Sequence, residues 1–191
     1  MVGEMMRDNK IRAKKWMILI FLVLSVIVGV ILWTLNFEKI IPIGFPNQTV
    51  CFGMSVSEVL FEAGIPDRKH EEDGIRSCKY VYTNIDILGY TGSTVYIFNN
   101  HEENKNAKVI TAYLTLKDES QTKCDKMMDD LQNYFENLFC DEPGFQVEVD
   151  EEVHRIGVEE PIEERLISTS VRVIRITQVN GIINVETYPK A

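Results

Sequence analysis

Residues 54–66 read MSVSEVLFEAGIP and predict a two-turn helix with both ends marked. Ser55 and Glu58 have the spacing of a capping box, in which each side chain accepts a hydrogen bond from the backbone amide of the other residue. Gly64 suits the left-handed position just after a helix, and Pro66 cannot continue one. Because a helix of two turns is not stable alone, it must pack against other elements.

A β-sheet is predicted after this helix. Cys78, Tyr80 and Tyr82 are separated by single residues, which is the two-residue period of a strand. β-Branched and aromatic residues fill Thr94–Phe98, and a third run, Val109–Leu116, places four apolar residues on one face (Ile110, Ala112, Leu114 and Leu116). Three such strands joined by short loops predict an antiparallel meander.

A longer helix and more strands complete the expected domain. Apolar residues recur there at three- and four-residue steps, which predicts a helix that packs its apolar face on the core (Cys124, Met127, Met128, Leu131, Tyr134, Phe135, Leu138 and Phe139). Phe145, Val147 and Val149 alternate as in a strand, and Asn180-Gly181 is a typical hairpin turn between Ser170–Val179 and Ile182–Tyr188. We therefore expect an α+β fold, with antiparallel strands packed against one short and one long helix.

An uncharged apolar run, Trp16–Phe37, precedes this domain. Twenty helical residues span about 30 Å, the thickness of the hydrocarbon core of a bilayer, so residues 16–36 are expected to form a transmembrane helix. Only Lys39 follows the run within fifteen residues, whereas five basic residues precede it (Arg7, Lys10, Arg12, Lys14 and Lys15). This asymmetry predicts a cytoplasmic N-terminus. No small-residue cleavage site follows, so the run is interpreted as an uncleaved signal anchor.

Four segments follow from these features: a basic cytoplasmic tail (1–15), the transmembrane helix (16–36), a Pro- and Gly-containing stalk (37–49) and an extracytoplasmic α+β domain (50–191). Residues 37–191 carry 27 acidic and 15 basic side chains, a net charge of −12. Nucleic acid is excluded as a partner, because binding to phosphates needs clustered Lys and Arg. The expected partners are the membrane, through one integral helix, and a protein or cell-wall component.

Part of the domain resembles a known family. Phe52-Gly53-Met54-Ser55, Glu58-Val59, Gly64-Ile65-Pro66 and Tyr80-Val81-Tyr82 are similar to the pattern of BamE/SmpA-like domains. These small bacterial envelope domains share a helix-then-meander unit with the β-lactamase-inhibitor proteins. The resemblance covers about residues 52–116, and it implies a fold unit and a binding role in the envelope. The later helix and strands leave open a second, diverged unit of the same kind.

The four cysteines, Cys51, Cys78, Cys124 and Cys140, are candidates for disulfide bonds. An exported compartment permits disulfides, and four cysteines allow three connectivities. Cys124 and Cys140 are 16 residues apart on one helical pattern, about 24 Å, whereas a disulfide needs Cα atoms within about 7 Å. If disulfides form, each of these two cysteines is therefore expected to pair with Cys51 or Cys78. Four free or partly buried thiols are the alternative.

No catalytic signature is found in the sequence, and no catalytic, cofactor-binding or metal-ligating residue is predicted. GxSxG, P-loop, GxGxxG and HExxH motifs are absent from the chain. Two His-Glu-Glu runs, His70–Glu72 and His101–Glu103, lie in polar sequence and are interpreted as solvated loops. The expected function is a non-enzymatic binding or assembly module of the cell envelope. The alternative is a metal-dependent or hydrolytic enzyme that uses these acidic and histidine-containing loops.

Overall fold

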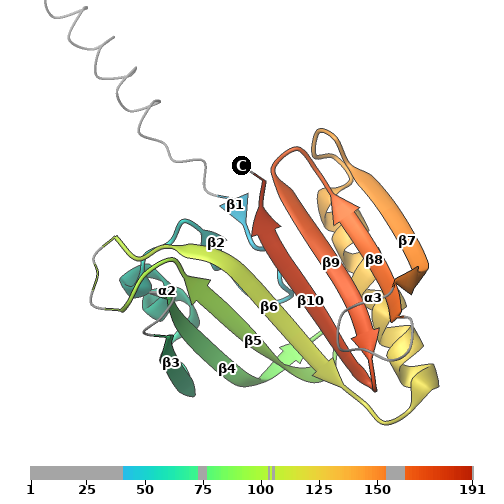
Figure 1. The fold of residues 1–191 in the computed structure, drawn as a ribbon, viewed down its shortest axis with the longest axis horizontal. Helices are drawn as coiled ribbons and strands as arrows, with labels where there is room; N and C mark the ends of the chain where they lie inside the picture. Colours follow the sequence, from blue (N-terminus) through green and yellow to red (C-terminus); the bar gives the residue numbers. More distant parts are fainter. Residues whose placement is uncertain (1–40, 73–76, 103, 105, 154–161, 191) are drawn as a thin grey trace, which may run out of the picture. The chain divides into compact units, whose positions relative to one another are not determined.

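A computed structural model describes residues 41–72, 77–102, 104, 106–153 and 162–190 (Figure 1). Two helices and ten strands occur in these ranges, in the order β1 (Ile41–Pro42), β2 (Cys51–Phe52), α2 (Val56–Ala63), β3 (Arg68–Glu72), β4 (Ser77–Ile87), β5 (Tyr90–Phe98), β6 (Val109–Lys117), α3 (Gln121–Phe139), β7 (Gln146–Val153), β8 (Ile162–Ser168), β9 (Arg172–Val179) and β10 (Ile182–Pro189). They belong to one compact unit that begins at Ile40.

Eight of the strands form one antiparallel sheet in the order β3-β4-β5-β6-β10-β9-β8-β7. The sheet has two halves of the same composition, because α2 precedes β3–β6 and α3 precedes β7–β10. The last strands of the two halves, β6 and β10, pair with each other at the centre of the sheet. The element order therefore agrees with the second helix-then-strands unit that the sequence left open.

The two faces of the sheet differ because successive residues of a strand point to opposite sides. A cross-strand row on one face is completely buried (Tyr80, Tyr96, Ala112, Thr187, Ile174 and Ile167). Val59 of α2 and Met128 of α3 join the same core, so both helices cover this face. Neither α2 nor α3 covers the other face, and Figure 1 looks onto it, with α3 behind the strands of the second half.

The predicted short helix is confirmed as α2. Both capping-box bonds are present between Ser55 and Glu58, the helix ends at Ala63, and Gly64 has a φ of 81°. The hydroxyl of Tyr82 donates to the carbonyl oxygen of Gly64 at 3.0 Å, which fastens the end of α2 to the sheet. Local capping signals and one tertiary bond thus position this helix.

The predicted long helix is confirmed as α3. Most of its expected apolar stripe is buried in the core (Cys124, Met127, Met128, Leu131, Phe135 and Phe139), but Leu138 is 47% exposed. The β9–β10 hairpin is also confirmed, with Asn180 and Gly181 both at positive φ in the turn. Such φ values are those of the tight turn that Asn-Gly favours.

The predicted third strand is confirmed as β6, but one of its residues was assigned to the wrong face. Ile110 is 42% exposed, whereas Val109 and Ala112 are buried. The pairing register between β5 and β6 shifts after Ile97, which pairs with Thr111, because Phe98 pairs with Val109. A β-bulge therefore interrupts the alternation and turns Ile110 outward.

The stalk predicted at residues 37–49 is wrong for its described part, residues 41–49. Ile43 and Phe45 are each only 1% exposed and belong to the core. Gly44 has a φ of 82°, and a Cβ atom there would lie 2.4 Å from Cζ of Phe139. The proline- and glycine-containing composition thus reflects a tightly turned segment that packs against α3, and the domain begins before residue 50.

The predicted fold class is also wrong. The described residues form a sheet-rich fold, in which eight strands make one continuous sheet and only two helices accompany it. Within these ranges, no helix is long and apolar enough to cross a membrane. The expected transmembrane helix is therefore not a feature of the described structure, and residues 16–36 lie outside it. The location in the cell stays a prediction.

Candidate functional site

The uncovered face of the sheet, hereafter the open face, carries one row of residues across all eight strands. Strand pairing places them in the order Arg68, Val81, Val95, Tyr113, Glu186, Arg175, Leu166 and Glu148. The six central side chains, from Val81 to Leu166, are half-buried. The open face therefore has a centre of three aliphatic residues, a tyrosine and an ion pair, with charged residues at both sheet edges.

A hydrogen-bonded network holds the centre of the open face. The hydroxyl of Tyr113 donates to Oε1 of Glu186 at 2.8 Å. Nη1 of Arg175 lies 2.9 Å from the other oxygen of Glu186, and its Nε lies 3.3 Å from Oε1 of Glu164. These contacts join β6, β10, β9 and β8 and fix the two largest polar side chains in place.

The network keeps fixed protonation states at neutral pH. Burial and the adjacent Glu186 carboxylate together raise the pKa of Tyr113 to about 12. Burial alone would lower the pKa of Arg175, but the carboxylates of Glu164 and Glu186 more than offset this and raise it. Tyr113 is therefore a neutral donor and Arg175 a permanent cation, so neither has the shifted pKa that acid–base catalysis near neutral pH needs.

Charge is divided across the open face. The β3–β4 side carries Arg68 and, in a neighbouring cross-strand pair, His70 and Lys79. The β7–β8 side carries Glu148 and, in another cross-strand pair, Asp150 and Glu164. The open face is thus basic at its β3–β4 end and acidic at its β7–β8 end.

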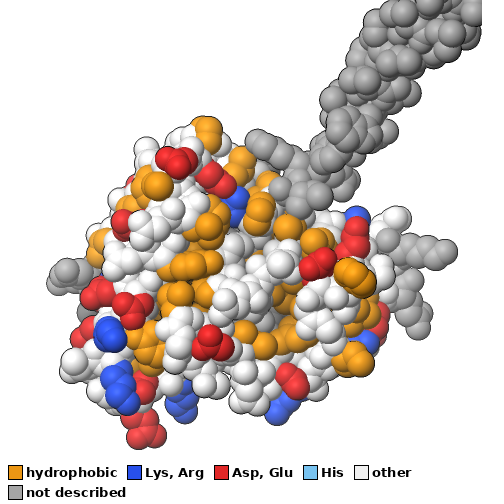
Figure 2. Space-filling model, turned by 180° about the vertical axis from the view of Figure 1, so that it is seen from behind, with side chains coloured by type: hydrophobic (Ala, Val, Ile, Leu, Met, Phe, Trp, Pro, Cys, Tyr) orange, Lys and Arg blue, Asp and Glu red, His pale blue; other side chains and the backbone are white. Residues whose placement is uncertain are grey.

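A small cavity lies on the covered face, between the sheet, the end of α2 and the loop that joins β1 to β2. Its volume is about 170 Å³, and Tyr82, Tyr96, Gln48 and Glu62 are among its lining residues. These polar groups already have partners, because Tyr96 bonds Gln48 and Thr49 donates to Glu62 at 2.6 Å. Apolar side chains lie between charged ones on this side of the domain (Figure 2). The cavity has no free polar group from this set to orient a ligand.

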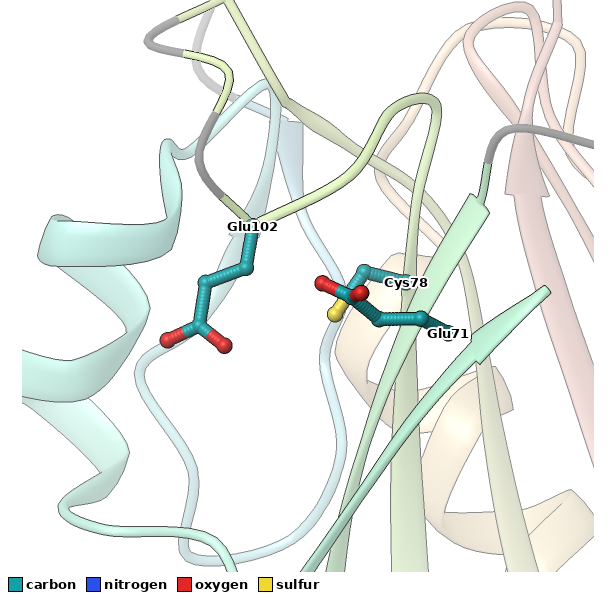
Figure 3. A group of neighbouring side chains, drawn as sticks. All are labelled: Glu71, Cys78 and Glu102. Carbon is teal, nitrogen blue, oxygen red and sulfur yellow. The ribbon is translucent and has the colours of Figure 1, made fainter. Parts of the chain in front are cut away.

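A cluster of potential metal ligands lies at the β3 edge of the sheet. Glu71, Cys78 and Glu102 each offer one ligand atom, and these atoms lie within 4.8 Å of one another. Cys78 and Glu71 come from the paired strands β4 and β3, and Glu102 comes from the loop after β5. The sulfur of Cys78 points toward Glu102 (Figure 3). Nζ of Lys69 lies 2.5 Å from Oε1 of Glu102. Residues of both His-Glu-Glu runs therefore meet at one place.

The histidine of the first run does not join this cluster. His70 pairs with Lys79, and its neighbour Glu71 pairs with Cys78, so the two side chains leave β3 on opposite faces. His70–Glu72 was interpreted as a solvated loop, but these residues belong to the edge strand β3. Successive residues of β3 point to opposite faces, which separates His70 from Glu71. A run of charged residues has no apolar alternation, so the sequence did not reveal this strand.

All four cysteines are free thiols in the structure. Cys51, Cys78 and Cys124 are buried, and Cys140 is exposed at the C-terminal end of α3. The continuous helix between Cys124 and Cys140 keeps them about 24 Å apart, as expected from its length. No disulfide bond links any of the four cysteines in the structure. The pairings of Cys124 and Cys140 with Cys51 or Cys78 therefore stay predictions.

Alkylation of the native protein should distinguish these thiols. Burial raises the pKa of Cys51 and Cys124, and it raises that of Cys78 to about 11. Only the thiolate reacts, so iodoacetamide at pH 8 should modify Cys140 at least about 100-fold faster than the other three. Peptide mapping by mass spectrometry measures the four rates, with unfolded protein as the control. Comparable rates in the native state would contradict the described burial.

Comparison with protein-family models, with curated proteins and with solved structures gives no significant match to this chain or its fold. The resemblance to BamE/SmpA-like domains stays a prediction.

Proposed function

We propose that this domain is a non-catalytic protein-binding module and that the open face is its contact surface. The observation that carries the proposal is the fixed Tyr113–Glu186–Arg175 network at the centre of this face. Tyr and Arg are enriched among the residues that dominate binding energy at protein interfaces. Side chains that are already held in one geometry lose little conformational entropy on binding, which favours affinity.

The composition of the open face supports a protein as the ligand. Val81 and Val95 lie beside Tyr113 in the central row, and the charged residues lie toward the two edges. An apolar and aromatic centre with a charged rim is the usual anatomy of a protein interface. The acidic end at Glu148, Asp150 and Glu164 selects for a partner that presents basic side chains opposite β7 and β8.

Site-specific photocrosslinking in cells tests this proposal. A photoreactive phenylalanine analogue at position 113 should give one discrete crosslinked protein, and the same analogue at the exposed position 57 of α2 should not. Charge reversal of Glu164 to Lys, in the variant that carries the analogue at position 113, should reduce the crosslink at least about tenfold. Equal crosslinking from positions 113 and 57, or no effect of Glu164→Lys, would refute the open face as the contact surface.

A further inference from the structure

We propose that Glu71, Cys78 and Glu102 form a binding site for a divalent transition-metal ion of the zinc class. The site is assembled by strand pairing, since Glu71 lies opposite Cys78 on the neighbouring strand. The loop after β5 then brings Glu102 to the same place (Figure 3). The three potential ligand atoms lie within 4.8 Å of one another.

The buried Tyr80 hydroxyl is an independent sign of a ligand at this place. Tyr80 is completely buried, and its hydroxyl finds no hydrogen-bond partner of good geometry among the residues that the structure describes. It lies against the Glu102 carboxylate, close enough to interact with it but not in good hydrogen-bond geometry. An unsatisfied buried hydroxyl is costly, and a water molecule on a metal ion bound beside Glu102 would satisfy it.

The donor set selects the metal class. A thiolate with two carboxylates suits Zn²⁺ and chemically similar ions, whereas Mg²⁺ and Ca²⁺ prefer oxygen ligands alone. Tetrahedral Zn²⁺ with these ligands needs donor–donor distances of about 3.3 to 3.5 Å. The observed limit of 4.8 Å must therefore shorten by at most about 1.5 Å. Rotation of the flexible glutamate side chains provides this change.

The surrounding charges suit a bound dication. One thiolate and two carboxylates would leave a bound M²⁺ with a net charge of −1, and the Lys69 ammonium balances it. Its ion pair uses Oε1 of Glu102, which leaves Oε2 to coordinate the metal. Three protein ligands leave a fourth position for water, which is the arrangement of an open site.

Metal binding at this place releases one proton. The S–H bond of Cys78 breaks, the sulfur keeps the electron pair and bonds to M²⁺, and the proton passes to solvent, with no change of oxidation state.

Cobalt(II) titration of the full chain tests the site. Wild-type protein should bind one equivalent with a thiolate-to-cobalt charge-transfer band, and Zn²⁺ should displace it. Cys78→Ser should abolish this band, whereas Cys124→Ser, which removes another buried thiol, should retain it. Glu71→Gln, at the exposed edge of the sheet, should weaken binding at least about tenfold without disturbing the core.

Two results would overturn the proposal: no charge-transfer band in the wild type, or a band that survives Cys78→Ser. If Cys78→Ser does not fold, the decision rests on Glu71→Gln, and unchanged affinity in that variant contradicts the site.

Discussion

Replacing Arg172 with Met should lower the free energy of unfolding by about 3 to 5 kcal/mol, the usual cost of breaking a buried ion pair. The side chain of Arg172 is only 2% exposed, and its guanidinium makes two hydrogen bonds to Glu142, at 2.6 and 3.1 Å. It also donates to the carbonyl oxygen of Pro42 and stacks 4.0 Å from the ring centre of Phe139. Arg172 thus joins β9, the end of α3 and the β1 segment.

Urea unfolding followed by circular dichroism measures this effect, with Arg68→Met at an exposed position of β3 as the control. The control should change the free energy of unfolding by less than about 0.5 kcal/mol. The double variant Arg172→Met with Glu142→Leu should recover part of the loss, because it leaves no half-buried charge without its partner. Equal stability of Arg172→Met and Arg68→Met would show that the buried network contributes nothing.

Phe45→Ala should also cost about 3 to 5 kcal/mol, because truncation of a buried phenylalanine leaves a cavity. Phe45 is 1% exposed, although its segment has the composition of a linker. Phe61→Ala is a matched control, since the side chain of Phe61 on α2 is 87% exposed. Thermal and urea unfolding should separate the two variants clearly. Similar stabilities would restore the stalk interpretation for this segment.

Elements with strong local signals could be predicted from the sequence. The capping residues Ser55 and Glu58 defined α2, and the Asn180-Gly181 turn defined the β9–β10 hairpin. The periodic apolar stripe defined α3 because a helix that packs on one face repeats its core residues every three or four positions. In each case the information lies within a few neighbouring residues.

Two strands of the sheet could not be predicted because charged side chains hide their alternation. β3 reads RKHEE, and a charged edge strand is a common way to prevent association of sheet edges. β8 reads IEERLIS, in which Arg165 occupies the covered face beside α3. Its Nη1 lies 2.7 Å from Oδ1 of Asp129 on that helix. The sequence does not show whether a charged side chain forms an ion pair with a residue far along the chain or is exposed to solvent.

The proposed sites depend on contacts that the sequence does not contain. Glu71, Cys78 and Glu102 come from three separate segments, and the register of β3 with β4 decides that Glu71, not His70, meets the cysteine. Tyr113, Glu186 and Arg175 likewise meet only because β6, β10 and β9 are neighbours in the sheet. The sole signal in the sequence was the repeated His-Glu-Glu pattern.

The central claim is that the open face is covered by a partner protein, and hydroxyl-radical footprinting tests it most directly. The labelling rates of Tyr113 and Phe61 should be compared in intact cells and in the purified full chain, because Phe61 is 87% exposed and lies on α2, away from the open face. We expect the ratio of Tyr113 to Phe61 labelling to fall at least about fivefold in cells, since a partner that contacts an interface centre excludes solvent from it. An unchanged ratio would contradict the account.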